Sequence, residues 1–173
     1  MKIRIGHKTK NYRAVWFENG KVKLIDQTKL PFKFQIFTSR NYKQTSKAIK
    51  DMIVRGAPAI GATAGYATAQ AALQFKGSNL KRFHSCMSKA AKQIKCARPT
   101  AIDLAHAVDK VVSITKKARS VKEAKLAAVF QANLIAEQYV SVCAQIGENG
   151  NRLIKRGDNI LTHCNAGALA TVD

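Results

Sequence analysis

The chain contains an uncharged stretch, GAPAIGATAGYATAQAALQF, that runs from Gly56 to Phe75. A stretch of this length without a charged residue raises the question of a membrane span. Its hydrophobicity is, however, diluted by one proline and several polar residues, namely Pro58, Thr63, Thr68, Gln70 and Gln74. The remaining residues are mostly alanine and glycine, which allow close helix packing. We therefore predict a buried helix over residues 58–75 and no membrane partner.

Apolar residues recur at helical spacing on both sides of this stretch. The further predicted helices cover residues 42–54, 79–95, 100–117 and about 120–146. Ser120 and Glu123 have the spacing of a capping box, which supports the start of the last helix. Gly147 and Gly150 are suited to ending it, because glycine is the residue that most often terminates a helix.

The amino-terminal part of the chain has the pattern of short strands. Two apolar runs, at residues 14–17 and 21–25, flank Asn19 and Gly20. An Asn-Gly pair between two such runs is a strong signal for a β-hairpin. A third short apolar stretch follows at residues 32–37. We predict a small antiparallel unit that precedes the helices.

The carboxyl-terminal residues suggest a different kind of layer. Residues 156–158 form a predicted turn, and residues 159–163 read as a buried strand followed by small residues that could begin a helix. One strand cannot form a sheet, so it either pairs with another chain or begins a domain whose remainder is missing. The predicted fold class is α+β: a β-hairpin and helical domain over residues 1–155, then the start of a truncated Rossmann-like domain over residues 156–173.

The chain is strongly basic, with 30 lysines and arginines against 10 aspartates and glutamates and a net charge of +20. Such a charge normally favours a nucleic-acid partner. The lysines, however, are scattered over nearly every predicted element, and no basic motif interleaved with aromatic residues is present. We expect a solvated, lysine-rich surface that attracts anionic metabolites, with nonspecific nucleic-acid binding as an alternative.

Four cysteines occur without a CxxC pair or a zinc-ligand spacing, so no metal site is predicted. No secretory signal appears at the polar, basic amino terminus, and a cytoplasmic protein with reduced thiols is expected. Cys86, Cys96 and Cys143 fall on predicted helices and are expected to be small apolar fillers. Cys164 differs, because it lies between the predicted strand and a turn containing Gly167. A thiol there fits a reactive group at a strand end, and an inert buried cysteine is the alternative.

The histidines give no support to a nucleophilic dyad. His163 precedes Cys164, and successive side chains of a strand point to opposite faces. The other histidines, His7, His84 and His106, have no spacing that indicates a site.

Two arginines precede prolines in similar local sequences. Arg55 and Gly56 come just before Pro58, a residue favoured in the first turn of a helix. Backbone N–H groups at a helix start, together with a guanidinium, form an anion site suited to phosphate. Arg98 repeats this arrangement directly before Pro99. A tight interhelical turn with an exposed arginine is the alternative, but two such arginines favour phosphate binding.

Several segments together resemble the methylthioribose-1-phosphate isomerase family. They are residues 54–61 (VRGAPAIG), 97–101 (ARPTA), 158–171 (DNILTHCNAGALAT) and, less specifically, 25–31 (IDQTKLP). The resemblance implies an aldose-ketose isomerase of methionine salvage that converts 5-methylthioribose 1-phosphate to 5-methylthioribulose 1-phosphate without a cofactor. It also implies a helical amino-terminal domain, a Rossmann-like carboxyl-terminal domain and a homodimer.

The resemblance assigns roles to specific residues. The implied phosphate-binding residues are Arg55, Gly56, Ala57 and Arg98, and the implied catalytic residue is Cys164. The family's catalytic aspartate lies in its carboxyl-terminal domain and is not matched by Asp173, and Asn149 stands where the family has a histidine. We therefore expect the amino-terminal part of an isomerase that is inactive without a separate carboxyl-terminal half. The alternative is a noncatalytic remnant or regulatory subunit that binds phosphorylated ligands.

Overall fold

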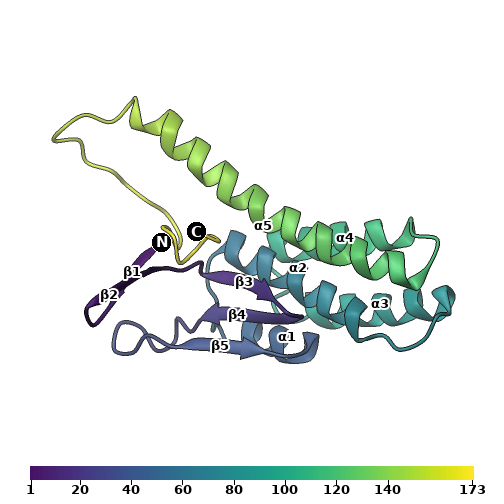
Figure 1. Ribbon diagram of the computed structural model, residues 1–173. Coiled ribbons are helices and arrows are strands. Elements are labelled where there is room, and N and C mark those ends of the chain that lie inside the picture. The colour runs from purple at the N-terminus through teal and green to yellow at the C-terminus, as the bar shows by residue number, and fades with distance from the viewer.

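The computed structural model describes residues 1–173, apart from the side chain of Ile5. Its strands are β1 (Lys2–Ile5), β2 (Lys8–Asn11), β3 (Val15–Glu18), β4 (Lys21–Ile25) and β5 (Ile36–Ser39). Its helices are α1 (Tyr42–Lys50), α2 (Ala57–Gln74), α3 (Leu80–Lys95), α4 (Ile102–Lys116) and α5 (Val121–Asn151). The predicted α+β class is confirmed: two small antiparallel sheets precede five helices in the described chain (Figure 1).

Helix α2 lies at the centre of the molecule and contacts all four other helices as well as β3 and β4. Every residue from Ala59 to Ala72 is buried, as the composition of this stretch predicts. Small side chains let the surrounding helices approach closely: Gly65, for example, lies against Ala107 on α4 and Ile135 on α5. Among the described residues, no helix is both long and apolar enough to span a bilayer.

The predicted hairpin is confirmed as β3 and β4, which pair antiparallel with Val15 opposite Leu24. Asn19 and Gly20 both have positive φ, at 49° and 74°, as a type I′ turn requires. Strand β5 completes a sheet of order β3-β4-β5. The β1–β2 hairpin was not predicted, because its polar, basic sequence does not show the apolar alternation of a half-buried strand.

A buried glutamine fastens this sheet to the helices. Gln70 of α2 donates hydrogen bonds from Nε2 to the carbonyl oxygens of Gly20 and Ser39, each at 3.1 Å, and accepts one from the hydroxyl of Thr45 at 2.6 Å. The three partners come from the β3–β4 turn, β5 and α1. Since a buried polar group is costly unless it is paired, this network fixes the relative position of these elements.

Helix α5 is longer than predicted. It begins as expected, with the Ser120 hydroxyl accepting from the Glu123 backbone N–H at 3.1 Å and the Glu123 carboxylate accepting from Arg119 N–H at 2.8 Å. The predicted end near residue 146 is wrong, because the helix passes through Gly147 and Gly150. Neither glycine has positive φ, so neither adopts the conformation that ends a helix.

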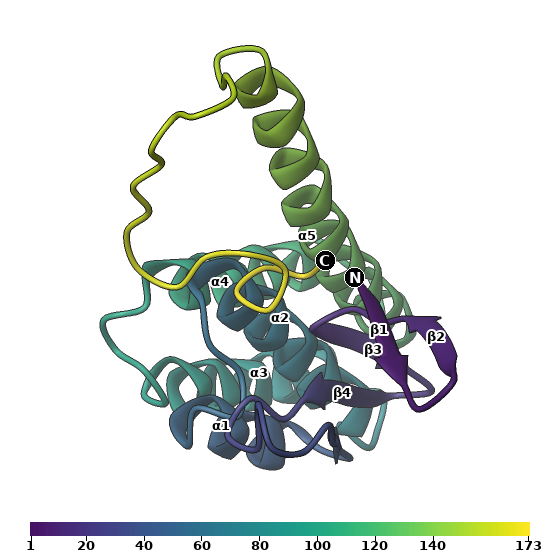
Figure 2. The same ribbon diagram turned by 90° about the vertical axis from the view of Figure 1, so that its left-hand side faces the viewer.

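The predicted strand over residues 159–163 is also wrong. Residues 152–167 form an exposed segment that arcs away from the end of α5 and returns to the start of α2 (Figure 2). No strand of the described chain lies beside this segment, so its backbone has no ladder to join. We call residues 152–167 the strap.

After the strap, residues 168–173 pack back onto the body. Ala170 and Val172 are buried, and the Val172 carbonyl accepts a hydrogen bond from Ala14 N–H at 2.9 Å. Asp173 lies beside Arg13, so the two ends of the chain meet on one side of the molecule (Figure 1). The boundary near residue 155 remains a prediction, and the last residues are tied to the first part of the chain.

Candidate functional site

A cavity of about 550 Å³ opens where the start of α2, the turn before α4 and the strap converge. Its lining residues are Met52, Arg55, Gly56, Ala57, Ile60, Arg98, Thr100, Ala101, Cys164 and Asn165. All five residues assigned to the site from the sequence therefore line one cavity, although they are far apart in the chain. Sequence reasoning assigned no role to Met52, Thr100 or Asn165, although Thr100 and Asn165 lie within the 97–101 and 158–171 segments.

The wall formed by α2 depends on a glycine. Gly56 has φ of 95°, and a Cβ added there would lie 2.2 Å from the carbonyl oxygen of Ala170. Pro58 stands in the first turn of α2, as predicted. The Ala59 N–H donates to the Ala170 carbonyl at 3.2 Å, whereas the N–H groups of Gly56 and Ala57 have no hydrogen-bond acceptor within the described chain. These two amides remain free for an anion.

Two guanidinium groups border the same cavity. Arg55 is exposed and Arg98 is half-buried, and neither forms an ion pair with any described residue. The expectation that Pro99 opens α4 is wrong, because the helix begins at Ile102 and Pro99 lies in the preceding turn. Arg98 is nevertheless held there, since its carbonyl accepts the Ala101 N–H at 3.1 Å. Two uncompensated cations at one cavity suit an anionic ligand.

Cys164 lies at the edge of the cavity in an unusual backbone conformation. Its φ is 63°, and Met52, which also lines the cavity, has φ of 59°. Left-handed residues other than glycine are uncommon and gather at functional sites. The thiol is exposed, so it stands in a turn rather than at a strand end as expected. This exposure argues against the alternative of an inert buried cysteine.

The other cysteines also differ from expectation. Cys86 and Cys96 are exposed and Cys143 is only half-buried, so the prediction of apolar fillers is wrong for the first two and incomplete for the third. Cys86 lies on the exposed side of α3 and Cys96 directly follows that helix, and periodicity alone did not predict this exposure. All are free thiols.

Gln27 connects two segments that lie next to the cavity residues in the chain. Its backbone N–H donates to the Ile53 carbonyl at 3.0 Å, next to the loop that carries Arg55. Its side-chain Nε2 donates to the Leu169 carbonyl at 2.7 Å, in the turn that follows Cys164. The only sequence signal for this role was the position of Gln27 inside the 25–31 segment.

The lining of the cavity includes no carboxylate and no histidine. No group of three or more described histidine, cysteine, aspartate or glutamate side chains is arranged to hold a metal ion. His106 instead borders a second cavity of about 540 Å³ between α4 and α5, together with Asp103 and Tyr139. Burial, with a smaller contribution from Asp103, raises the pKa of Tyr139 to about 12. The first cavity thus offers cations, amides and one thiol.

Comparison with known proteins identifies the family of the chain. The initiation factor 2 subunit family matches residues 53–172, a range that holds every residue of the cavity except Met52. The chain belongs to this family. Members with curated names include the methylthioribose-1-phosphate isomerase of Acetivibrio thermocellus, which is 43% identical over 157 residues, covering 90% of this chain and 46% of that protein. The isomerase of Caldanaerobacter subterraneus is 39% identical over 165 residues, covering 94% and 48%.

Solved structures of the family have the same fold. The 5-methylthioribose 1-phosphate isomerase from Pyrococcus horikoshii OT3 superposes with a TM-score of 0.87 at 37% identity and covers 94% of this chain and 46% of its own. The translation initiation factor eIF-2B, subunit delta, from A. fulgidus gives a TM-score of 0.85 at 39% identity, covering 94% and 48%. The chain thus spans about half the length of the relatives it matches.

Proposed function

We propose that this chain binds a sugar 1-phosphate in the cavity between α2, α4 and the strap, and that it contributes Cys164 to the isomerisation of 5-methylthioribose 1-phosphate. The observation that carries the proposal is the convergence of Arg55, Arg98 and Cys164 on one cavity from three distant parts of the chain. The curated relatives at about 40% identity are named methylthioribose-1-phosphate isomerase, and we take the proposed substrate from that name.

The phosphate is the part of the substrate that the chain is best equipped to hold. A phosphate offers oxygens that accept from both guanidinium groups and from the free amides of Gly56 and Ala57. No carboxylate in the lining competes for the arginines. With the phosphate fixed there, the sugar carbon that bears it would lie close to the wall that carries Cys164.

The proposed reaction moves hydrogen within the sugar without an external oxidant. The C2–H bond breaks and a C1–H bond forms, so that C2 is oxidised to a ketone while C1 is reduced. The C1–O bond of the ring breaks, and the ring oxygen takes up a proton while the C2 hydroxyl loses one. Because the phosphate on C1 prevents ordinary ring opening to a free aldehyde, two acid–base groups are needed. Cys164 is proposed as one of them.

The second acid–base group is proposed to come from outside residues 1–173. The cavity lining contains no carboxylate or histidine, and the relatives are about twice as long as this chain. We propose that residues corresponding to the carboxyl-terminal half of the relatives complete the site over the strap. Such an assembly belongs in the cytoplasm, where the four free cysteines stay reduced.

The test mixes the purified chain with 5-methylthioribose 1-phosphate, with and without the carboxyl-terminal half of the Acetivibrio thermocellus relative, and follows ketose formation by NMR. We expect ketose in the mixture only, and none when the chain carries Cys164→Ala. The matched control Cys96→Ala, another exposed thiol, should leave the rate unchanged. Absence of ketose from a mixture whose halves co-elute would refute the catalytic proposal, and turnover by the chain alone would refute the need for a second half.

A regulatory subunit that binds phosphorylated ligands is the second candidate. It is favoured by the similarity to the eIF-2B delta subunit, whose TM-score nearly equals that of the isomerase, and by the missing acid–base partner in the lining. The two candidates differ in the role of Cys164. Ligand binding that depends on Arg98 but not on Cys164, with no turnover in any mixture, would favour the regulatory subunit.

A further inference from the structure

The β1–β2 hairpin concentrates positive charge that nothing in the described chain compensates. Its cations are Lys2, Arg4, Lys8 and Lys10, with His7 in the turn between the strands. None of the four cations forms an ion pair with a described residue, and no acidic residue precedes Glu18. Only a few lysines elsewhere have acidic partners: Lys23 pairs with Glu18, Lys47 with Asp51 and Lys95 with Asp109. The hairpin differs from the helices in carrying four cations within residues 2–10, a segment without any acidic residue.

The register of the hairpin distributes these charges over both of its faces. Lys2 lies opposite Asn11 and Arg4 lies opposite Thr9, which places both cations on one face. Lys10 lies opposite Ile3, and Lys8 follows the same alternation, so this pair occupies the other face. A ribbon with cations on both faces suits a partner that meets it from both sides.

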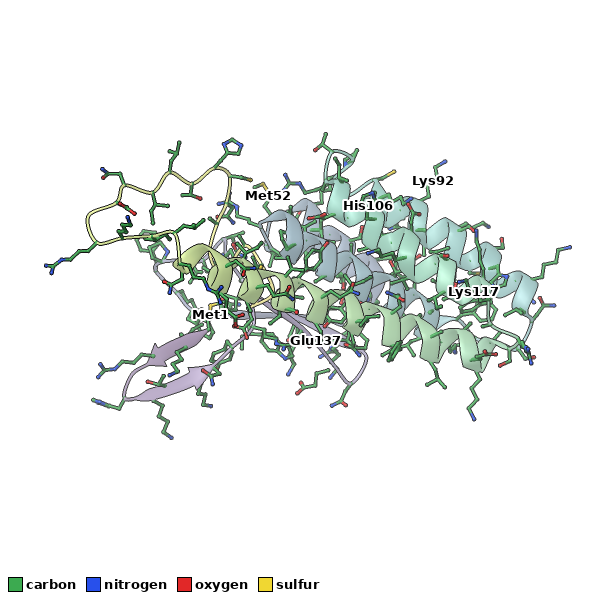
Figure 3. All side chains as sticks on the ribbon, turned by 90° about the horizontal axis from the view of Figure 1, so that it is seen from above. Met1, Met52, Lys92, His106, Lys117 and Glu137 are labelled. Carbon is green, nitrogen blue, oxygen red and sulfur yellow. The ribbon has the colours of Figure 1, made fainter. Side chains whose placement is uncertain are left out.

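The hairpin is held firmly at its base and extends away from the helices. The Tyr12 N–H donates to the Met1 carbonyl at 2.9 Å, which closes the two strands. The Tyr12 ring contacts Phe34 with ring centroids 5.1 Å apart and Trp16 with centroids 6.3 Å apart. In Figure 1 the hairpin projects from the body, and in Figure 3 side chains extend outward from its two strands. It also lies outside the family match at residues 53–172, so the proposed sugar-phosphate site leaves it without a role.

From this placement we propose that the β1–β2 hairpin binds the phosphate backbone of duplex DNA. The major groove is about 12 Å wide and admits a two-stranded β-ribbon, and phosphates line both of its edges. Cations on both faces of the ribbon can thus contact phosphates at the same time, whereas a flat anionic surface would contact only one face. The scattered lysines of the helices add a diffuse attraction. The proposal is independent of the isomerase and concerns a nonspecific, backbone-directed contact.

The test compares two variants of equal net charge. One carries Lys2→Gln, Arg4→Gln, Lys8→Gln and Lys10→Gln, and the control carries Lys81→Gln, Lys89→Gln, Lys92→Gln and Lys116→Gln, four exposed and unpaired lysines on α3 and α4. Binding to a short fluorescein-labelled DNA duplex is followed by anisotropy over a salt series. Each phosphate contact contributes about 0.9 to the magnitude of the slope of log K against log salt, so loss of the four hairpin charges should lower that magnitude by up to about 3.6. The control should lower it by less than about 1.

Several results would overturn the proposal. Equal slopes for the two variants would show that bulk charge, rather than the hairpin, makes the contact. Tighter binding of single-stranded RNA of the same length would reject a duplex groove as the target. Binding to vesicles containing phosphatidylserine is measured in the same way. If the hairpin variant loses vesicle binding as strongly as duplex binding, the ribbon is a general anion contact and the proposal of a DNA duplex as its partner is wrong. Circular dichroism and thermal unfolding of both variants establish that each is folded.

Discussion

The central helix and the strap both line the same cavity, yet they differ in exposure and in the number of contacts that hold them. Every residue of α2 from Ala59 to Ala72 is buried, whereas every residue from Asn151 to Gly167 is exposed. The α2 wall is fixed by contacts with four helices and two strands. The strap wall is attached to the body mainly through the residues that follow it, 168–173.

The difference shows that burial depends on neighbours as much as on composition. The strap contains large apolar side chains, and Ile160 and Leu161 are 70% and 97% exposed. Helix α2 is built from smaller residues but has packing partners on all sides. The proposed site accordingly joins a rigid phosphate-binding wall to a thiol whose position depends on a few contacts.

The sharpest contrast comes from two isoleucines. Ile60→Ala in α2 removes a side chain that is only 4% exposed and should lower the free energy of unfolding by about 2–5 kcal/mol. Ile160→Ala in the strap should change it by less than about 0.5 kcal/mol, because that side chain is already in water. Urea unfolding followed by circular dichroism measures both. Similar losses for the two variants would mean that the strap is packed in solution.

A pair of glycines tests the junction between the two regions. Gly56 and Gly157 have nearly equal φ values of 95° and 94°, but an added Cβ would clash with Ala170 only at Gly56. Gly56→Ala should cost about 1–3 kcal/mol and weaken binding of 5-methylthioribose 1-phosphate. Gly157→Ala lies in an exposed segment that can relax, and should cost less than about 1 kcal/mol and leave binding unchanged. Urea unfolding measures the change in stability, and calorimetric titration measures the change in affinity. Equal losses of affinity in the two variants would contradict the role given to the close contact between Gly56 and Ala170.

Gln27 tests how the carboxyl-terminal residues are held. Gln27→Ala removes the hydrogen bond to the Leu169 carbonyl and should cost about 1 kcal/mol. The amides of Ala59 and Ala170, which bond within this junction, should then exchange with solvent faster. Hydrogen exchange followed by NMR measures their rates. Gln74→Ala, which loses a comparable bond to the Arg40 carbonyl, should leave these two amides unaffected. If these two amides exchange at the same rate in Gln27→Ala as in the unmodified chain, Gln27 does not hold the carboxyl-terminal residues in place.

The smallest effect concerns the ion pair between Arg13 and Glu137. Arg13 donates to both carboxylate oxygens of Glu137, with Nη2 to Oε2 at 3.0 Å, and this bonding holds the pKa of Glu137 below its ordinary value. A lowered folded-state pKa stabilises the fold above the unfolded pKa, and the gain is lost as pH falls through the folded value. Because the pair is largely exposed, Glu137→Gln should cost about 0.2–1 kcal/mol at neutral pH. Urea titrations at neutral pH and near pH 3 should show the difference disappear in acid, and a loss independent of pH would contradict the pairing.

Much of the helical part of the fold could be predicted from the sequence, because local signals and tertiary packing agree there. The capping box at Ser120, the Asn19-Gly20 turn and the uncharged α2 stretch all formed as expected. Predictions failed where the outcome depends on neighbours that a local pattern does not contain. Residues 159–163 have strand-like composition but no strand beside them, and Gly147 lies in an exposed helix that continues through it.

The candidate site was predictable to a different degree. The motifs pointed to Arg55, Arg98 and Cys164, and the fold brings them to one cavity. The left-handed backbone of Cys164 and the bridging role of Gln27 depend on tertiary contacts, and no short motif encodes them. The concentration of charge on the β1–β2 hairpin was not predicted for the same reason, because its cations come together only when the two strands pair.

Arg55, Arg98 and Cys164 are proposed to line one sugar-phosphate site, and protection of the thiol by ligand is the decisive test. The chain is treated with iodoacetamide, with and without 5-methylthioribose 1-phosphate, and each cysteine is quantified by mass spectrometry, with the exposed Cys86 and Cys96 as internal references. We predict that the ligand slows alkylation of Cys164 alone and that Arg98→Gln abolishes this protection. Protection that is equal at all three thiols, or that survives in Arg98→Gln, would contradict it.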